Sequence, residues 1–163
     1  MGFSRYNRSM NKSLLEEMCG KRPRIAFEKT HCNAILPSKT YPQDVGWDLY
    51  AVEDVTIPAK SQNVVDIGLK LAYLDQGYWF KIESRSGLAF NHDITAFAGI
   101  IDNTYRGVIG IKLFNFSTID YQVKVGDRIA QMVIYMENID FDVQWGNVVQ
   151  TNRGSGGFGS TGI

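Results

Sequence analysis

Apolar and polar side chains alternate in short runs along most of the chain, and turn-forming residues separate the runs. The ranges that carry this pattern are 24–29, 47–51, 63–71, 78–82, 108–116, 121–125 and 129–135. Successive side chains of a β-strand point to opposite faces of a sheet, so a period of two predicts strands. Outside residues 1–24, no run of ten residues carries a strong helical period. The pattern therefore predicts one all-β domain, a sandwich or a barrel of short strands.

The two ends of the chain lack this alternation. Residues 1–24 are basic and poorly patterned, which predicts a disordered leader before a β domain at 25–150. Residues 151–163 are rich in glycine, so their backbone N–H groups can approach an anion closely. The same segment carries one arginine, several hydroxyls and a single ring, Phe158, which can cover a flat base. We predict a mobile C-terminal arm that closes over a phosphorylated ligand; a solvated tail is the alternative.

Charge and composition narrow the class of protein. Lysine plus arginine and aspartate plus glutamate both number 17, so the formal net charge is zero. This balance argues against a broad nucleic-acid or membrane surface. The chain has 2 cysteines, too few for a disulfide framework, and no apolar run approaches the ~20 residues of a membrane span. We expect a protein of the cytoplasm or nucleus that is not secreted and binds neither nucleic acid nor membrane.

Three segments carry candidate chemistry. The runs 98–101 and 108–113 predict a β-hairpin whose connection, 102–107, bears an acid, a phenol and a guanidinium. Arg85, Ser86 and Gly87 follow a strand and can present a guanidinium, a hydroxyl and an open N–H to a phosphate. Gln131 lies inside an apolar run and must find partners for its amide.

The chain lacks the side chains of several common mechanisms. It has 2 histidines, neither of them in a recognisable serine or cysteine nucleophile motif, and no Cys/His metal spacing. Carboxylates, arginines and a hard divalent cation remain, a set that suits phosphate chemistry.

Five segments taken in order, 45–50, 84–89, 98–107, 126–131 and 153–162, resemble the five motifs of the trimeric dUTPase family. The resemblance runs from about Ile25 to the C-terminus. It implies a jelly-roll-like β-barrel, a homotrimer with active sites shared between subunits, and hydrolysis of dUTP to dUMP and pyrophosphate with Mg²⁺. In such a trimer one chain supplies the first, second and fourth motifs of an active site and another supplies the third. The C-terminal arm of the remaining chain extends over that site.

The resemblance also implies residue roles. Asp102 would hold and activate the attacking water, and Asp48 would bind Mg²⁺ through water. Tyr105 would pack against the deoxyribose, and Phe158 would stack on uracil. The residues implied to bind phosphates are Arg85, Ser86, Gly87, Gln131, Arg153, Gly159, Ser160 and Thr161, and those implied to read the uracil edge through their backbone are Gly99, Ile101 and Gly110.

The chain departs from the family pattern at a few positions, and two alternative functions stay open. Val45 and Trp47 replace the usual alanine and smaller aromatic of the first motif. Glu83 adds a carboxylate near the expected triphosphate site, and we expect it to face away or to pair with a cation. Asn103 stands where the family frequently has an acid, and we expect no consequence. A dUTP-sensing regulator that binds a protein partner through the same fold is one alternative function. A dCTP deaminase is the other, to which Glu83 lends slight support.

Overall fold

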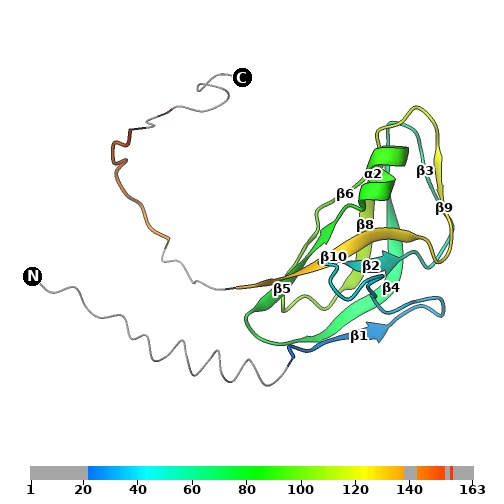
Figure 1. Cartoon of the computed structure of the whole chain (residues 1–163), viewed down its shortest axis with the longest axis horizontal. Helices are drawn as coiled ribbons and strands as arrows, with labels where there is room; N and C mark the ends of the chain where they lie inside the picture. Colours follow the sequence, from blue (N-terminus) through cyan, green and yellow to red (C-terminus); the bar gives the residue numbers. More distant parts are fainter. Residues whose placement is uncertain (1–21, 138–142, 153–154, 156–163) are drawn as a thin grey trace, which may run out of the picture.

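The computed structural model describes residues 22–137, 143–152 and 155. Residues 1–21, and with them most of the predicted leader, lie outside this range. The strands are β1 (Ile25–Lys29), β2 (Trp47–Tyr50), β3 (Val55–Ile57), β4 (Gln62–Leu74), β5 (Tyr78–Glu83), β6 (Ile94–Phe97), β7 (Ile100–Ile101), β8 (Val108–Asn115), β9 (Tyr121–Val123) and β10 (Arg128–Met136). One helix, α2 (Ser86–His92), follows β5 (Figure 1).

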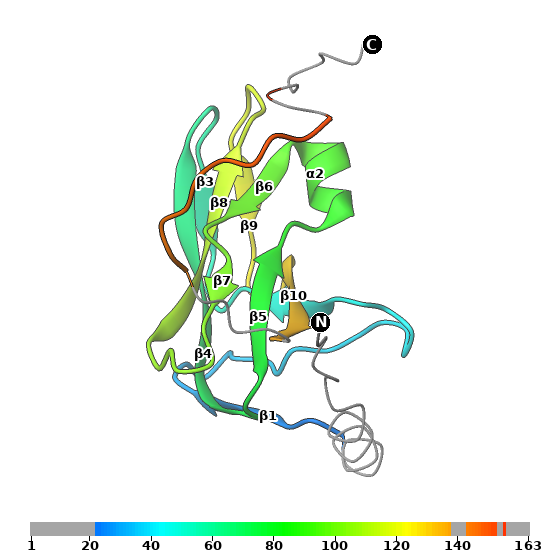
Figure 2. The ribbon, with the colours of Figure 1, turned by 90° about the vertical axis from the view of Figure 1, so that its left-hand side faces the viewer.

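Two four-stranded sheets make up the body of the protein. One has the strand order β1-β4-β8-β6 and the other the order β2-β10-β5-β7; β3 and β9 form a separate pair. The pairings within both larger sheets are antiparallel. Figure 2 shows the long strand β4 on one side of the molecule, with β5 and β10 on the other. The all-β prediction is confirmed, in the double-sheet arrangement that jelly rolls share.

The core lies between the two sheets and follows the alternation in the sequence. On β8, Ile109, Ile111 and Leu113 are buried, whereas the residues between them are exposed or half-buried. The rings of Phe27 on β1 and Phe80 on β5 meet edge to face across the core, with centroids 6.3 Å apart. Apolar burial of this kind is the main favourable term in folding, so the period-two pattern fixes which face of each strand turns inward.

The predicted hairpin across 102–107 is wrong. The strand β7 pairs with β5 through Ile101 and Phe80, and β8 pairs with β4 and β6 in the other sheet. Segment 102–107 therefore crosses from one sheet to the other. Alternation predicted both strands, but it carries no information on which strand pairs with which.

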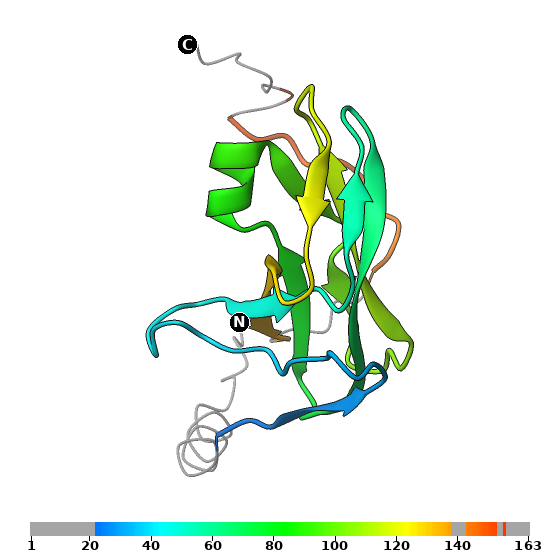
Figure 3. The same ribbon diagram turned by 90° about the vertical axis from the view of Figure 1, so that its right-hand side faces the viewer.

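Helix α2 occupies a segment that lies outside the runs predicted as strands. It is seven residues long, it buries Leu88, and it ends at Asp93, whose φ of 56° is in the left-handed region. In Figures 2 and 3, α2 and the loop between β1 and β2 extend from the same side of the molecule. None of the helices among the described residues is long and apolar enough to cross a membrane.

Segment 143–150 leaves its large apolar side chains exposed, unlike the two sheets. Its large apolar side chains, Val143, Trp145, Val148 and Val149, are between 81% and 103% exposed. Figure 1 shows this part of the chain running apart from the sheets. The predicted domain boundary at residue 150 stays a prediction.

Candidate active site

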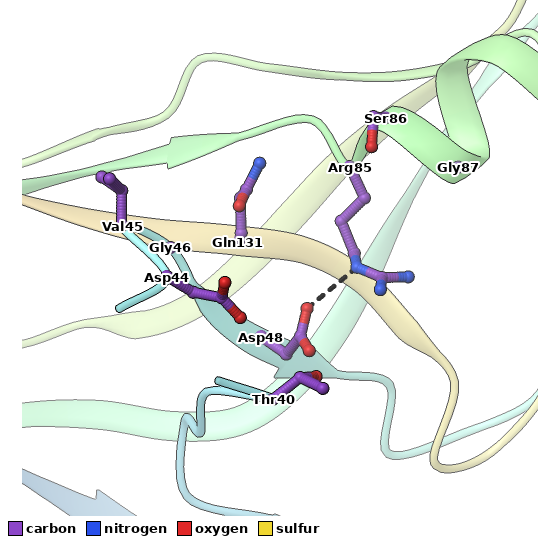
Figure 4. Close-up of a pocket in the computed structure, with 9 residues that line it drawn as sticks. All are labelled: Thr40, Asp44, Val45, Gly46, Asp48, Arg85, Ser86, Gly87 and Gln131. Atoms are coloured by element: carbon purple, nitrogen blue, oxygen red, sulfur yellow. Dashed lines mark hydrogen bonds and ion pairs between the residues drawn. The ribbon is translucent and has the colours of Figure 1, made fainter. Parts of the chain in front are cut away.

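A polar cavity of about 270 Å³ opens between the loop after β1, the start of α2 and strand β10 (Figure 4). The residues that line it are Thr40, Asp44, Val45, Gly46, Asp48, Arg85, Ser86, Gly87 and Gln131. These residues come from three segments that are far apart in the sequence. The cavity brings together five of the predicted site residues, from the first, second and fourth motifs, and we call it the phosphate pocket.

Asp48 and two arginines form the charged centre of the phosphate pocket. Arg85 Nε donates to Asp48 Oδ1 over 2.9 Å, as Figure 4 shows, and Arg128 Nη1 donates to Asp48 Oδ2 over 3.2 Å. The Asp48 side chain is 14% exposed and that of Arg85 25%, so water screens this pair only in part. Arg128 Nη1 also donates to Thr40 Oγ1, which ties the loop after β1 to β10. Asp48 therefore orients two cations beside the cavity.

The contacts of Arg128 were not predictable from the sequence. Nothing in the pattern pairs Arg128 with Thr40, which lies 88 residues away along the chain. The two residues meet because β2 and β10 are neighbouring strands. A long-range contact of this kind has no local sequence signal.

Gln131 closes one wall of the phosphate pocket, and Gly46 makes room for it. Gln131 Nε2 donates to the carbonyl oxygen of Ser84 over 2.8 Å, which meets the expectation that this amide finds a partner. A Cβ added at Gly46 would lie only 2.0 Å from Gln131 Oε1. Any side chain at position 46 would therefore displace the carboxamide, because real Cβ contacts are never so close.

Glu83 lies directly across the sheet from Gln131. Its Oε1 is 2.5 Å from Lys81 Nζ, so the expected pairing with a cation is confirmed. The hydrogen bond to Glu83 is the main reason that the pKa of Lys81 lies above its ordinary value. The carboxylate near the pocket is thus neutralised by a neighbour on its own strand.

Asp102 lies in a different cavity from Arg85. That second cavity, of about 480 Å³, is lined by Tyr78, Trp79, Ile100, Asp102, Asn103, Thr104 and Glu137. Tyr105 follows closely, and its hydroxyl donates to the carbonyl oxygen of Val108 over 3.0 Å. Within one chain the structure therefore separates the candidate base from the phosphate pocket.

The glycines implied to read the base lie apart in the fold, with Gly99 in the loop before β7 and Gly110 on β8. Gly99 is buried next to β5, where its carbonyl oxygen accepts from Ile82 N over 2.7 Å. A Cβ at Gly99 would lie 2.2 Å from the oxygen of Ile82, so this close backbone approach requires glycine. Gly110 is an exposed position on β8, paired with Asp66. The remaining candidates, Arg153, Phe158, Gly159, Ser160 and Thr161, lie outside the described residues.

The side chains of the phosphate pocket suit a hard cation only if water and a phosphate ligand supply its other ligands. Asp44, Asp48 and the hydroxyl of Thr40 supply oxygen donors of the kind that Mg²⁺ prefers. In the part of the chain that the structure describes, no group of three His, Cys, Asp or Glu side chains could hold a metal. These oxygen donors fit an ion that keeps much of its bound water and is also bound by a phosphate ligand.

A polar pocket lined by an arginine, a serine and a glycine backbone suits a phosphate-bearing ligand. A family model described as dUTPase matches residues 32–162. A deoxyuridine 5'-triphosphate nucleotidohydrolase of Helicobacter pylori is 43% identical over 142 residues, which are 86% of this chain and 97% of that protein. One of Solanum lycopersicum is 41% identical over 144 residues, or 88% of this chain and 85% of that protein. The chain belongs to the dUTPase family.

Solved structures share the fold. The dUTPase of Staphylococcus bacteriophage 80alpha with dUpNHpp has a TM-score of 0.77 at 23% identity, covering 86% of this chain and 99% of that one. A mutant dUTPase from phage phi11 of S. aureus, described with a structural Mg(II) ion, has a TM-score of 0.66 at 21% identity, covering 79% and 99%. At these identities the likeness shows the fold alone.

Proposed function

We propose that the chain hydrolyses dUTP to dUMP and pyrophosphate. The observation that carries the proposal is the phosphate pocket, in which Asp48, Arg85 and Gln131 meet in a chain of the dUTPase family. The reaction consumes a nucleotide that would otherwise place uracil in DNA, and it supplies dUMP for dTMP synthesis. We expect the chain to act in the cytoplasm or the nucleus.

The residues divide the work of phosphate hydrolysis between two sites. Arg85, Ser86, Gly87 and Gln131 bind the phosphates, where positioning and charge neutralisation dominate catalysis. Asp102 holds the attacking water and takes its proton as the water approaches the α-phosphorus in line. Asp48 would hold Mg²⁺ through water, and the ion would supply positive charge against the phosphates.

The third motif and the C-terminal arm recognise the substrate. Tyr105 packs against the deoxyribose and leaves no room for a 2′-hydroxyl. The backbone of Gly99, Ile101 and Gly110 reads the uracil edge and rejects cytosine and thymine, because an unpaired buried polar group or a clash is costly. The arm closes the site: Phe158 stacks on uracil, and Arg153, Gly159, Ser160 and Thr161 cover the terminal phosphates.

We also propose that the active site is completed by other copies of the chain, in a homotrimer. The separation of Asp102 from Arg85 into two cavities supports this assembly, because one chain alone does not bring the water and the phosphates together. The exposed apolar side chains from Val143 to Val149 support it as well, since a segment of this composition gains stability by packing against another surface.

Mixing two inactive variants tests the shared site. Asp102→Asn and Arg85→Ala, co-expressed in equal amounts, form some sites that combine an intact Asp102 with an intact Arg85. Random mixing restores about a quarter of wild-type activity if each site draws these residues from different chains. Arg85→Ala mixed with Gln131→Ala is the matched control, because both residues belong to one pocket and no restoration is expected. Absence of restoration in the first mixture would contradict the shared site.

The alternative functions gain no support from the site. The carboxylate of Glu83, which lent slight support to a deaminase, is held by Lys81. The curated relatives named above are nucleotidohydrolases, and no surface of the described residues favours a regulatory partner over a second copy of the chain.

A further inference from the structure

Three backbone carbonyl oxygens converge on the side chain of Asn103. Its Nδ2 donates to Leu74 O at 3.2 Å, to Asp75 O at 3.0 Å and to Tyr78 O at 2.9 Å. All three acceptors belong to the turn between β4 and β5 or to its flanks. A carboxamide nitrogen carries two hydrogens, so three acceptors share two donors. In this chain the three carbonyls require a donor, and the acid that the family frequently has at this position could not supply one as a carboxylate.

The residue that these bonds hold directly follows Asp102. Asn103 is half-buried, and both residues line the cavity of about 480 Å³. A second set of bonds lies within the segment itself. Arg106 Nη1 donates to the carbonyl oxygens of Asn103 at 2.7 Å and Tyr105 at 2.8 Å, and Tyr105 N donates to Asp102 O at 3.0 Å. The backbone that carries the Asp102 carboxylate is therefore tied to the β4–β5 turn through one side chain.

We propose that Asn103 is a positioning residue for Asp102, which rests on the role of Asp102 in the proposed function. A general base must lie within about 2.6–3.2 Å of the proton that it takes. Segment 102–107 crosses between sheets without ladder bonds of its own, so its position depends on side-chain contacts. Asn103 supplies the contact nearest to Asp102. The sequence led us to expect no consequence from an asparagine at this position, but its contacts indicate one.

Replacing the amide with a carboxylate of the same shape isolates this role. Asn103→Asp removes both donors and places a negative charge against three carbonyl oxygens, so the segment moves away from the turn. Displacement of a catalytic group by about 1 Å lowers rate on the order of a hundredfold. The phosphates are bound in the phosphate pocket, and Tyr105 is the one residue of this segment proposed to contact the substrate, so we expect kcat to fall far more than the affinity for dUpNHpp. Asn103→Ala removes the donors without adding charge, and it carries the test if Asn103→Asp does not fold.

The experiment compares wild type with Asn103→Asp, Asn103→Ala, Asp102→Asn and the double variant Asp102→Asn/Asn103→Asp. For each protein it measures kcat, KM, the affinity for dUpNHpp and the thermal midpoint. Asn63→Asp is the matched control, because its amide donates to a single carbonyl, that of Thr56, on an exposed strand outside both cavities. We expect a fall in kcat of about a hundredfold for both Asn103 variants and wild-type kcat for the control. In the Asp102→Asn background, the second substitution lowers the residual rate no further, because Asn103 acts through Asp102.

Each other outcome has a distinct meaning. Wild-type kcat in both Asn103 variants, beside an inactive Asp102→Asn variant, overturns the positioning role alone. A further loss of rate in the double variant, or a loss that resides in KM, also overturns it. Wild-type kcat in Asp102→Asn removes the base from the proposed function, and the positioning role falls with it.

Discussion

Asn115, at the end of β8, gives the sharpest test of the fold. It is the one buried polar or charged side chain among the described residues, at 0% exposure. Its Nδ2 donates to the carbonyl oxygens of Ile57 at 3.0 Å and Ile119 at 2.7 Å. Its Oδ1 accepts from the backbone N–H of Ser117 at 2.9 Å and from the Ser117 hydroxyl at 2.7 Å. One carboxamide thus joins β8, β3 and the turn before β9.

Asn115→Leu keeps the approximate volume and removes all four bonds, although the Ser117 hydroxyl still donates to the carbonyl oxygen of Ile119 over 2.9 Å. The carbonyl of Ile57 is fully buried in the core, and an orphaned buried acceptor costs about 1–3 kcal/mol. The groups of Ser117 and Ile119 are more exposed, and water can replace their lost bonds. The loss of these bonds therefore adds only about 1–2 kcal/mol in total to the cost. We therefore expect a loss of about 2–5 kcal/mol in the free energy of unfolding.

Urea denaturation followed by circular dichroism measures this loss. With a slope of about 2 kcal/mol per molar, the midpoint falls by about 1–2.5 M. Asn63→Leu is the control, because Asn63 makes similar bonds on an exposed part of β4 and its replacement costs about 0.5 kcal/mol or less. Both variants are compared at one protein concentration, because association contributes to stability. Equal midpoints for the two variants would refute the account of Asn115.

Three further predictions concern the site, the surface and the arm. Gly46→Ala displaces Gln131 and its hydrogen bond, so kcat/KM for dUTP falls about tenfold, and steady-state kinetics that match wild type would contradict the steric argument. The pKa of Asp54 lies below its ordinary value of 3.8, chiefly because its side chain is hydrogen-bonded to Lys124. A lowered folded-state pKa stabilises the protein above the unfolded value, and this contribution is lost as the pH falls through the folded value. Asp54→Asn is therefore less stable than wild type at pH 7, and the difference closes below pH 3.8; urea midpoints that differ equally at all pH values would exclude this linkage. Truncation after Asn152 leaves assembly intact by light scattering but removes most dUTP hydrolysis, and full activity of the truncated protein would rule out a role for the arm.

Alternation in the sequence predicted the long strands well, because burial of one sheet face imposes it. The predicted run 108–116 corresponds to β8, and 129–135 corresponds to β10. The short elements were missed because distant partners hold them. Strand β3 exists through its pairing with β9, and α2 begins with a serine and a glycine, which are poor helix formers, yet it buries Leu88.

The candidate site was predictable as a set of motifs but not as a geometry. The resemblance named Asp48, Arg85 and Gln131, and the structure brings them together in one pocket. The contacts that position them were not predictable, since Gly46 acts by lacking a side chain and Asn103 acts on carbonyl groups about 25–29 residues earlier. Such contacts depend on strand pairing, which the local sequence does not encode.

Release of pyrophosphate from dUTP, dTTP, dCTP and UTP, measured side by side with Mg²⁺, tests the proposed function most directly. We predict rapid release from dUTP and little from the other three, because the third motif is proposed to exclude a 5-methyl group, an exocyclic amine and a 2′-hydroxyl. Absence of release from dUTP, or equal release from dUTP and UTP, would contradict it.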